Sequence, residues 1–351
     1  MKIKISFILF LFLSALCFSQ VIKGSVVSAA EQPLSNVKIY IDGSQVSSVT
    51  DTKGIFDISI PNIKQGNIVF QKDGYQDFVY PLQQAMNKTL KVVLEKERLI
   101  EEVKLIGYSS KDYERYINTF FDNFLGVSRE GVSIENPKEV KFAHDKKEGI
   151  LRAQAKKPLI IINKKLGYTI EYKLVSFYVD YRNGISQYTG TSFYTPVKAS
   201  ESKNRVYKMN RLNAYYGSVQ HFFKSVFNNS VNKEGFILDR VKHMEGQKAL
   251  ALVEKNLQAP AYRSEADGKV YFEFPDILMV SYKKYLFDIS KREVVRTDSY
   301  STINSYVETR GLHYHITSDG NYSDPDQMLF QKSWAMDKVA KMLPLDYEPE
   351  K

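Results

Sequence analysis

The sequence predicts a β-rich protein of two domains, in which an N-terminal β-sandwich is followed by an α+β domain with mostly antiparallel strands and about three helices. The chain has 351 residues, which is enough for about two domains. Up to about residue 94, apolar and polar residues alternate in short runs, whereas apolar stripes at helical spacing begin only after residue 109. We therefore expect the sandwich at 20–95, a linker at 96–110 and the α+β domain at 111–351.

The N-terminus has the pattern of a signal peptide. Two lysines precede an apolar run from Ile5 to Phe18, which is shorter than the about 20 residues that span a membrane. Cys17 and Ser19 are small residues at the spacing that suits a signal peptidase. We expect residues 1–19 to be removed before Gln20, and the mature protein to be exported to the periplasm or to associate with the outer membrane. The alternative is an N-terminal anchor that stays uncleaved.

Cys17 raises the further alternative of a lipoprotein. A lipidation motif has a small residue just before the cysteine, however, and Leu16 is bulky. Cys17 is also the only cysteine in the chain. Removal of the signal peptide would therefore leave a protein without disulfides, thiol nucleophiles or thiolate metal sites.

The chain is basic, with a formal net charge of +9, to which the expected signal peptide contributes two lysines. Export argues against nucleic acid as the partner, whereas anionic lipid headgroups or acidic glycans are compatible with it. Lysine and arginine are spread along the sequence, which favours the interpretation that the excess charge keeps the protein soluble. We expect an envelope protein or a glycan as the partner, no nucleic acid, and a peripheral association with the outer membrane as a further option.

The alternation is clearest in the expected sandwich. Each apolar set recurs at every second position and so faces one side of a strand. These sets are Val37, Ile39 and Ile41, then Phe56, Ile58 and Ile60, then Ile68 and Phe70, and then Val92 and Leu94. Turn residues separate them at Asp42-Gly43, Asp51-Thr52-Lys53-Gly54 and Asp73-Gly74. Several short strands at this spacing are typical of a sandwich.

Four pieces of this region resemble the carboxypeptidase regulatory-like domain family. In chain order they are Gly24-Ser25-Val26-Val27, Pro33-Leu34-Ser35-Asn36-Val37, Thr50-Asp51-x-x-Gly54-x-Phe56 and Asp73-Gly74-Tyr75. The resemblance implies a prealbumin-like sandwich of seven strands, with structural roles for Gly24, Asp51, Gly54, Phe56, Gly74 and Tyr75. It does not imply peptidase activity, because this domain accompanies the catalytic part of certain peptidases and is not that part.

The segment from Leu99 to Tyr108 is similar to the one that follows this sandwich in TonB-dependent outer-membrane receptors, where it leads into a plug and a large barrel. The residues after Gly107 are too few for about 22 spanning strands of roughly ten residues each together with a plug. A small outer-membrane barrel fits by length and is one alternative, but the expected helices and the charged C-terminus argue against it.

The remainder mixes helical and strand patterns. Ser109 or Ser110 can cap a helix that runs to about Leu125, and further helices are expected at about 214–228 and 334–342. Strands are expected at 140–142, 159–163, 168–181, 187–194 and within 271–307, where a hairpin turns at Asp288-Ile-Ser-Lys291.

Three further pieces of the chain resemble exported carboxypeptidase-like regulatory-domain proteins of gram-negative bacteria, a family without an assigned activity. They are Pro158-Leu159-x-Ile-x-Asn163-Lys-x-Leu166-Gly167-Tyr168-x-Ile170-x-Tyr172-x-Leu174, Tyr216-Gly217-Ser218-x-x-His221-Phe222-Phe223 and Leu343-Pro344-Leu345-x-Tyr347-x-Pro349. This resemblance implies an architecture and a location, and no mechanism.

No motif predicts a catalytic residue or a cofactor. A zinc carboxypeptidase has His-x-x-Glu, and none of the five histidines is followed by Glu three residues later. The phosphate-binding loop, the dinucleotide fingerprint and Gly-x-Ser-x-Gly are absent from the sequence as well. A pair of carboxylates that hydrolyses glycosides would leave no sequence pattern, so a hydrolase with an unrecognised site in residues 111–351 is an alternative.

Histidines give the remaining candidates. His313 and His315 are weak candidates for metal ligands, because residues two apart on a strand share a face, but two ligands do not make a site. His221 lies opposite the stripe from Phe222 to Val226 on a helical wheel, which predicts a side chain that is exposed or hydrogen-bonded near Ser218 and Ser225.

Together these observations predict an exported cell-envelope protein that acts as a non-catalytic binding or interaction module for a partner protein or a glycan. The chain has 24 tyrosines, whose rings can stack on sugars, but tyrosine also suits ordinary strands, which is the interpretation we favour.

Overall fold

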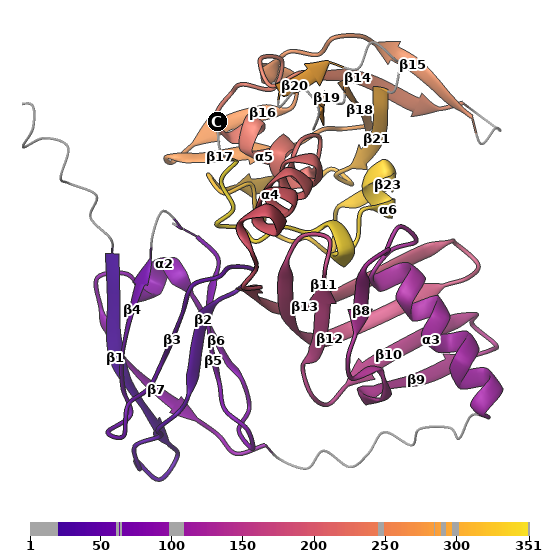
Figure 1. The fold of residues 1–351 in the computed structure, drawn as a ribbon. Coiled ribbons are helices and arrows are strands. Elements are labelled where there is room, and N and C mark those ends of the chain that lie inside the picture. Colours follow the sequence, from indigo (N-terminus) through magenta and orange to yellow (C-terminus); the bar gives the residue numbers. More distant parts are fainter. Residues whose placement is uncertain are drawn as a thin grey trace, which may run out of the picture. The chain divides into compact units, whose positions relative to one another are not determined.

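The chain folds into two compact units (Figure 1). The computed structural model describes residues 20–60, 63, 65–97, 109–244, 249–283, 285–288, 293–296 and 302–349. Within these, the first unit comprises residues 20–41 and 46–97, and the second comprises residues 42–45 and everything from 109 onward. The expected signal peptide and most of the expected linker lie outside the described residues.

The first unit is a β-sandwich, as the sequence predicts. Its strands are β1 (Gln20–Ser28), β2 (Lys38–Ile41), β3 (Ser47–Val49), β4 (Ile55–Ile60), β5 (Asn67–Gln71), β6 (Phe78–Pro81) and β7 (Thr89–Leu94), and one short helix, α2 (Leu82–Ala85), follows β6. One sheet has the order β4-β1-β7 and the other the order β3-β2-β5-β6. Strands β1 and β7 are parallel, and the other pairs are antiparallel.

The core of the sandwich is made by the alternating residues. Strand β4 shows the pattern without a break, since Phe56, Ile58 and Ile60 are buried while the residues between them are exposed. The ring of Phe56 meets that of Phe70, on the opposite sheet, edge to face at 5.4 Å between centroids. Burial of these side chains from both sheets is the main contribution to the stability of this unit.

The six motif residues of the sandwich occupy turns and close contacts. Gly24 has no room for a side chain, because an added Cβ would lie 2.3 Å from the carbonyl oxygen of Leu90. The Asp51 carboxylate accepts hydrogen bonds from the amides of Lys53 and Ile55, which fixes the turn before β4. Gly54, in that turn, and Gly74 both have positive φ. Phe56 lies in the core, and Tyr75 packs at its margin.

The second unit begins with a six-stranded antiparallel sheet covered by a helix. The strands are β8 (Val132–Ile134), β9 (Val140–Asp145), β10 (Ile150–Ala155), β11 (Leu159–Asn163), β12 (Tyr168–Asp180) and β13 (Ile185–Pro196), in the order β8-β11-β12-β10-β9 with β13 paired to β12. Helix α3 (Ser110–Phe124) packs its aromatic stripe on this sheet. Ser109 caps α3 by accepting from the amide of Asp112, which confirms the predicted helix start.

A second core lies under smaller sheets. Their strands are β14 (Phe236–His243), β15 (Leu250–Glu254), β16 (Arg263–Ala266), β17 (Lys269–Phe272), β18 (Ile277–Lys283), β19 (Tyr285–Asp288), β20 (Glu293–Arg296), β21 (Thr302–Glu308), β22 (Tyr314–Ile316) and β23 (Leu329–Lys332). The sheets have the orders β15-β14-β18-β21-β23, β16-β17-β22 and β19-β20. Strands β19 and β20 flank the predicted hairpin turn, of which residues 289–291 lie outside the described residues.

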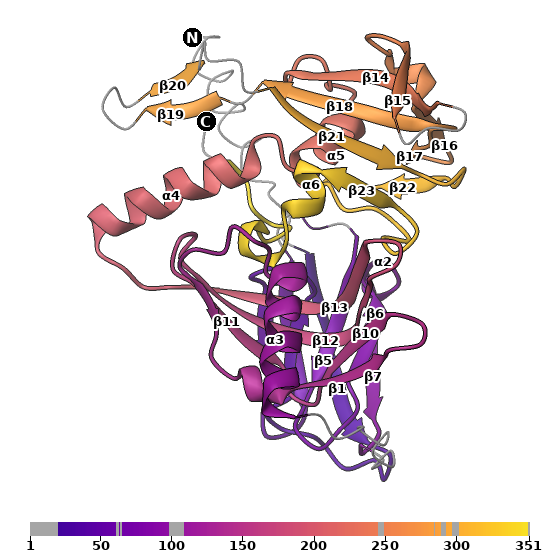
Figure 2. The same ribbon diagram turned by 90° about the vertical axis from the view of Figure 1, so that its right-hand side faces the viewer.

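The helices of the second unit differ in part from the prediction. Helix α5 (Val219–Phe227) is shorter than the predicted 214–228, and a separate helix, α4 (Glu201–Tyr215), precedes it and was missed. The predicted helix at 334–342 is reduced to α6 (Ser333–Met336) and a 3₁₀ turn at Val339–Lys341. Two further 3₁₀ turns lie at Pro137–Glu139 and Ala259–Ala261. Figure 2 shows α4 running along the side of this unit, where it contacts β19.

Candidate functional site

The most elaborate polar arrangement in the described part of the chain surrounds helix α5. This helix is buried along most of its length, and its residues from His221 to Val226 are all buried. Three of these, His221, Lys224 and Ser225, are polar. Buried polar groups are costly unless they are hydrogen-bonded, so their partners show what the helix is built to hold. We call the arrangement of α5 with Gly217, Glu234 and residues 344–348 the α5 junction.

His221 is held by two hydrogen-bonding partners. Its Nδ1 accepts from the amide of Gly217 at 3.1 Å, and its Nε2 lies 3.3 Å from Oε2 of Glu234. A ring nitrogen that accepts from an amide carries no proton, so Nε2 is the donor to Glu234. Burial lowers the pKa of His221, and the hydrogen bond to Glu234 opposes this only in part. The imidazole is therefore neutral and fixed in one tautomer.

The sequence predicts that His221 is either exposed or hydrogen-bonded near Ser218 and Ser225, and the prediction of an exposed side chain is wrong. The side chain is 3% exposed and is surrounded by the rings of Tyr215, Tyr216, Phe236 and Tyr282. The helical wheel assumes one solvent face, and α5 has packed chain on every side. The alternative of a hydrogen bond near Ser218 was closer, since Ser218 caps the helix by accepting from the backbone amide of His221.

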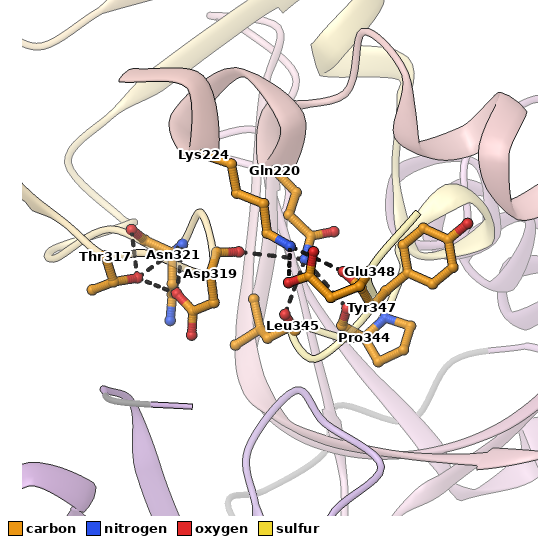
Figure 3. Close-up of polar contacts among 9 residues, drawn as sticks. All are labelled: Gln220, Lys224, Thr317, Asp319, Asn321, Pro344, Leu345, Tyr347 and Glu348. Carbon is orange, nitrogen blue, oxygen red and sulfur yellow. Dashed lines mark hydrogen bonds and ion pairs between the residues drawn. The ribbon is translucent and has the colours of Figure 1, made fainter. Parts of the chain in front are cut away.

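Helix α5 also holds the C-terminal segment, residues 343–349, as Figure 3 shows. The Lys224 ammonium donates to the carbonyl oxygen of Tyr347 at 3.0 Å and to Oε1 of Glu348 at 2.9 Å. One turn earlier, Nε2 of Gln220 lies 3.2 Å and 3.3 Å from the carbonyl oxygens of Pro344 and Leu345. The Lys224 side chain is only 8% exposed, so these bonds replace its lost hydration.

Gln220 reaches a third carbonyl oxygen, that of Asp319, at 3.4 Å. Asp319 belongs to a tight turn in which Thr317 and the amide of Asn321 donate to its Oδ1 (Figure 3). Its Oδ2 is buried and has no hydrogen-bond partner among the described residues. Gly320 lets this turn lie against α5, because an added Cβ would be 2.4 Å from the carbonyl oxygen of Gln220.

The three sequence pieces that share the second resemblance all make contacts between distant parts of the second unit. Asn163, in the first piece, donates to the carbonyl oxygen of Ala340 at 2.9 Å, just before the C-terminal segment. Gly217, in the second, accepts from the indole of Trp334 at 2.8 Å. The third piece is the segment held by Gln220 and Lys224. Residues that are far apart in the chain are thus brought together to fix the second unit.

The two histidines proposed as metal ligands lie elsewhere, at strand β22. His313 precedes the strand, is exposed and pairs with Glu273 at 2.9 Å. The ring of His315 lies against that of Tyr271, and burial with the nearby Lys269 lowers its pKa. Among the residues that the structure describes, no three His, Cys, Asp or Glu side chains are grouped closely enough to hold a metal ion.

Sequence reasoning missed Glu234, Gln220, Lys224 and Glu348. A lysine inside a helix rich in aromatic and apolar residues was the one available signal for Lys224, because a charge at that position needs a partner. Nothing in the sequence pairs it with a residue more than a hundred positions away. As arranged, the junction holds backbone carbonyls with the Gln220 amide and the Lys224 ammonium. The His221 imidazole instead accepts from the Gly217 amide and faces the Glu234 carboxylate, so these contacts all serve to hold the fold together.

The comparisons with known proteins agree with the first resemblance. Residues 22–105 match the family model of the CarboxypepD_reg-like domain, which covers the sandwich. No curated protein matches the chain. In the described residues, no helix has both the length and the apolar character needed to cross a membrane.

Proposed function

We propose that this protein is an exported cell-envelope protein that acts as a non-catalytic binding or interaction module. The observation that carries its non-catalytic part is the use of polar groups at the α5 junction, and export rests on the N-terminal sequence pattern. His221, Lys224 and Gln220 each contact the chain's own backbone or a carboxylate of the same junction. Groups so engaged stabilise the fold, and a reacting substrate would have to displace them.

A partner protein is favoured over a glycan by the edge of the second unit's five-stranded sheet. Strand β15 is at the end of that sheet and pairs only with β14 in the described part of the chain. Two of its apolar side chains are exposed, Leu252 at 47% and Val253 at 50%. An open edge with exposed apolar residues is the arrangement to which an extended segment of another protein adds as a strand.

The export part of the proposal is tested by the mass and location of the mature protein. We expect the protein in an envelope fraction, with a mass that corresponds to a chain starting at Gln20. A cytosolic protein that retains Met1 would contradict export.

The binding part is tested by chemical crosslinking in envelope extract followed by mass spectrometry. We expect crosslinked peptides of one partner near β15, and their loss in Leu252→Lys. Val175→Lys is the matched control, since Val175 is 64% exposed but lies within β12, away from that edge. Equal crosslinking in Leu252→Lys and the control, or a tight glycan ligand with no protein partner, would exclude a protein partner at this edge.

A further inference from the structure

The positive charge of this protein is concentrated in space, although it is spread along the sequence. Residues 164–165 and 198–215 contain seven lysines and arginines and a single carboxylate, Glu201, in a chain whose net charge is +9. The first pair lies in the loop between β11 and β12, and the second range contains α4. These two segments are therefore locally more basic than the rest of the chain.

The loop and the helix are locked together by hydrogen bonds. Asn210 donates to the carbonyl oxygen of Lys165 at 2.7 Å, and Arg211 donates to those of Leu166 and Gly167 at 2.7 Å and 3.0 Å. The Arg211 guanidinium also lies over the ring of Tyr168, 3.9 Å from its centroid. Arg211 thus holds the two segments together, and the remaining cations lie on the surface of these joined segments.

That surface is exposed and carries an apolar side chain among its cations. Lys164, Lys165, Lys198, Lys203, Arg205 and Lys208 are all exposed. Val206 is 48% exposed, next to Arg205 in sequence and three residues from Lys203. Glu201 pairs with Arg205 across 3.5 Å, but both side chains are well exposed, so this pair neutralises little of the charge. We call these six cations with Val206 the α4 basic surface.

We infer that the α4 basic surface docks on an anionic phospholipid membrane. Near a membrane rich in anionic lipid, each lysine or arginine contributes about 1 kcal/mol of attraction, so several cations give stable but salt-sensitive binding. An exposed valine between cations fits the headgroup boundary, where an apolar side chain is buried while the charges stay at the surface.

Other polyanions fit this surface less well. Single-stranded nucleic acids are commonly bound on exposed aromatic rings, whereas acidic polysaccharides also bind clustered cations and are distinguished from a membrane by the comparison with heparin below. The aromatic side chain of α4 nearest these cations, Tyr207, is buried, with its ring against Gly167. The inference does not depend on strand β15, so it and the proposed partner protein can fail separately.

The test is co-sedimentation of the full chain with vesicles of neutral phosphatidylcholine or of phosphatidylcholine with 30% phosphatidylglycerol, a composition of about one anionic lipid in three. The measured quantity is the ratio of the two partition coefficients. Lys2 and Lys4 are present in the parent and in every variant, so their contribution to the ratio is the same in each protein. We expect a ratio well above one that falls with added salt. In Lys164→Gln/Lys203→Gln it should fall about 25-fold, because two cations at about 1 kcal/mol are lost.

The matched control is Lys233→Gln/Lys255→Gln, which removes the same charge from two exposed lysines of the second unit outside this surface. We expect it to keep most of the ratio, and both variants to keep the unfolding temperature of the parent. Equal loss in the two variants would show a non-specific charge effect and overturn the inference. So would equal partitioning of the parent protein to both vesicles, or tighter binding to heparin than to anionic vesicles at the same salt.

Discussion

His221 makes the stability of the second unit sensitive to acid. Its pKa is lowered by burial, so the unfolded chain binds a proton on this residue at a higher pH than the folded one does. The contribution of the neutral His221 to the free energy of unfolding is therefore fully present above pH 6.5, the ordinary pKa of histidine. It is lost as pH falls below that value, by up to about 1.4 kcal/mol per pH unit. Glu234 favours the charged imidazole and Lys224 opposes it, but neither changes this direction.

The substitution His221→Asn tests this. Asparagine keeps an acceptor near the position of Nδ1 for the amide of Gly217 but has no proton to gain. We expect the variant to be less stable at pH 7.5, because it loses ring packing, and to lose less stability than the parent between pH 7.5 and pH 5.5. The free energy of unfolding in denaturant, measured at both values, gives the comparison. Equal losses in the two proteins would mean that His221 is protonated in the folded state.

At the scale of elements, α4 and α5 depend on Gly217, which lies between them. Its φ is +82°, and an added Cβ would lie 2.6 Å from the ring of Tyr282. Gly217→Ala should therefore cost roughly 1–2 kcal/mol for the left-handed backbone and about as much again for displacing the ring. Gly268→Ala is the matched control, because its φ is +70° with nothing within 4 Å, so only the backbone cost applies. Thermal unfolding of both variants measures the difference, and equal shifts would contradict a packing role for Gly217.

The hydrogen bonds from α5 to the C-terminal segment give a second prediction at this scale. Lys224→Met keeps the aliphatic length but leaves the carbonyl oxygen of Tyr347 without its donor. We expect faster hydrogen exchange at the amide of Tyr347, which donates to Pro344 at 2.9 Å, by about tenfold. Lys341→Met, which removes an exposed pair with Asp337, should leave that amide unchanged. Equal exchange in both variants would show that the segment is held by other contacts.

The elements that the sequence predicts well are those whose apolar spacing is decided locally. Strand β4 and helix α3 bury one face each, and their period and cap were sufficient to predict them. Helix α4 was missed because only Tyr207 and Tyr215 are buried on it, so it has no continuous apolar stripe. It is held to the loop after β11 by polar bonds to backbone carbonyls, for which a sequence has no pattern.

The candidate site was largely beyond prediction for the same reason. Its three sequence pieces could be recognised as a set, but the pairing of Lys224 with Glu348 or of Asn163 with Ala340 depends on the tertiary fold. The helical wheel misplaced His221 because burial on all sides removes the contrast that the wheel uses.

At the scale of the whole molecule, the two units have separate hydrophobic cores, one in the sandwich and two in the second unit. We expect Gly24→Ala to destabilise the sandwich alone. An added Cβ would lie 2.3 Å from the carbonyl oxygen of Leu90 and 2.8 Å from the ring of Phe56, so strand β1 must shift against β7. A cost of at least about 2 kcal/mol is expected from such overpacking, whereas Gly74→Ala meets no atom within 4 Å and should cost about half of that.

Differential scanning calorimetry with hydrogen exchange separates the units. The amides of β1, such as that of Val26, should exchange faster in Gly24→Ala, and one calorimetric transition should move to lower temperature. Exchange at α5 and the second transition should stay where they are in the parent, because the core under α5 shares no residue with the sandwich core. A single transition that shifts as a whole would instead mean that the two units unfold cooperatively, and that stability supplied by the α5 junction also supports the sandwich.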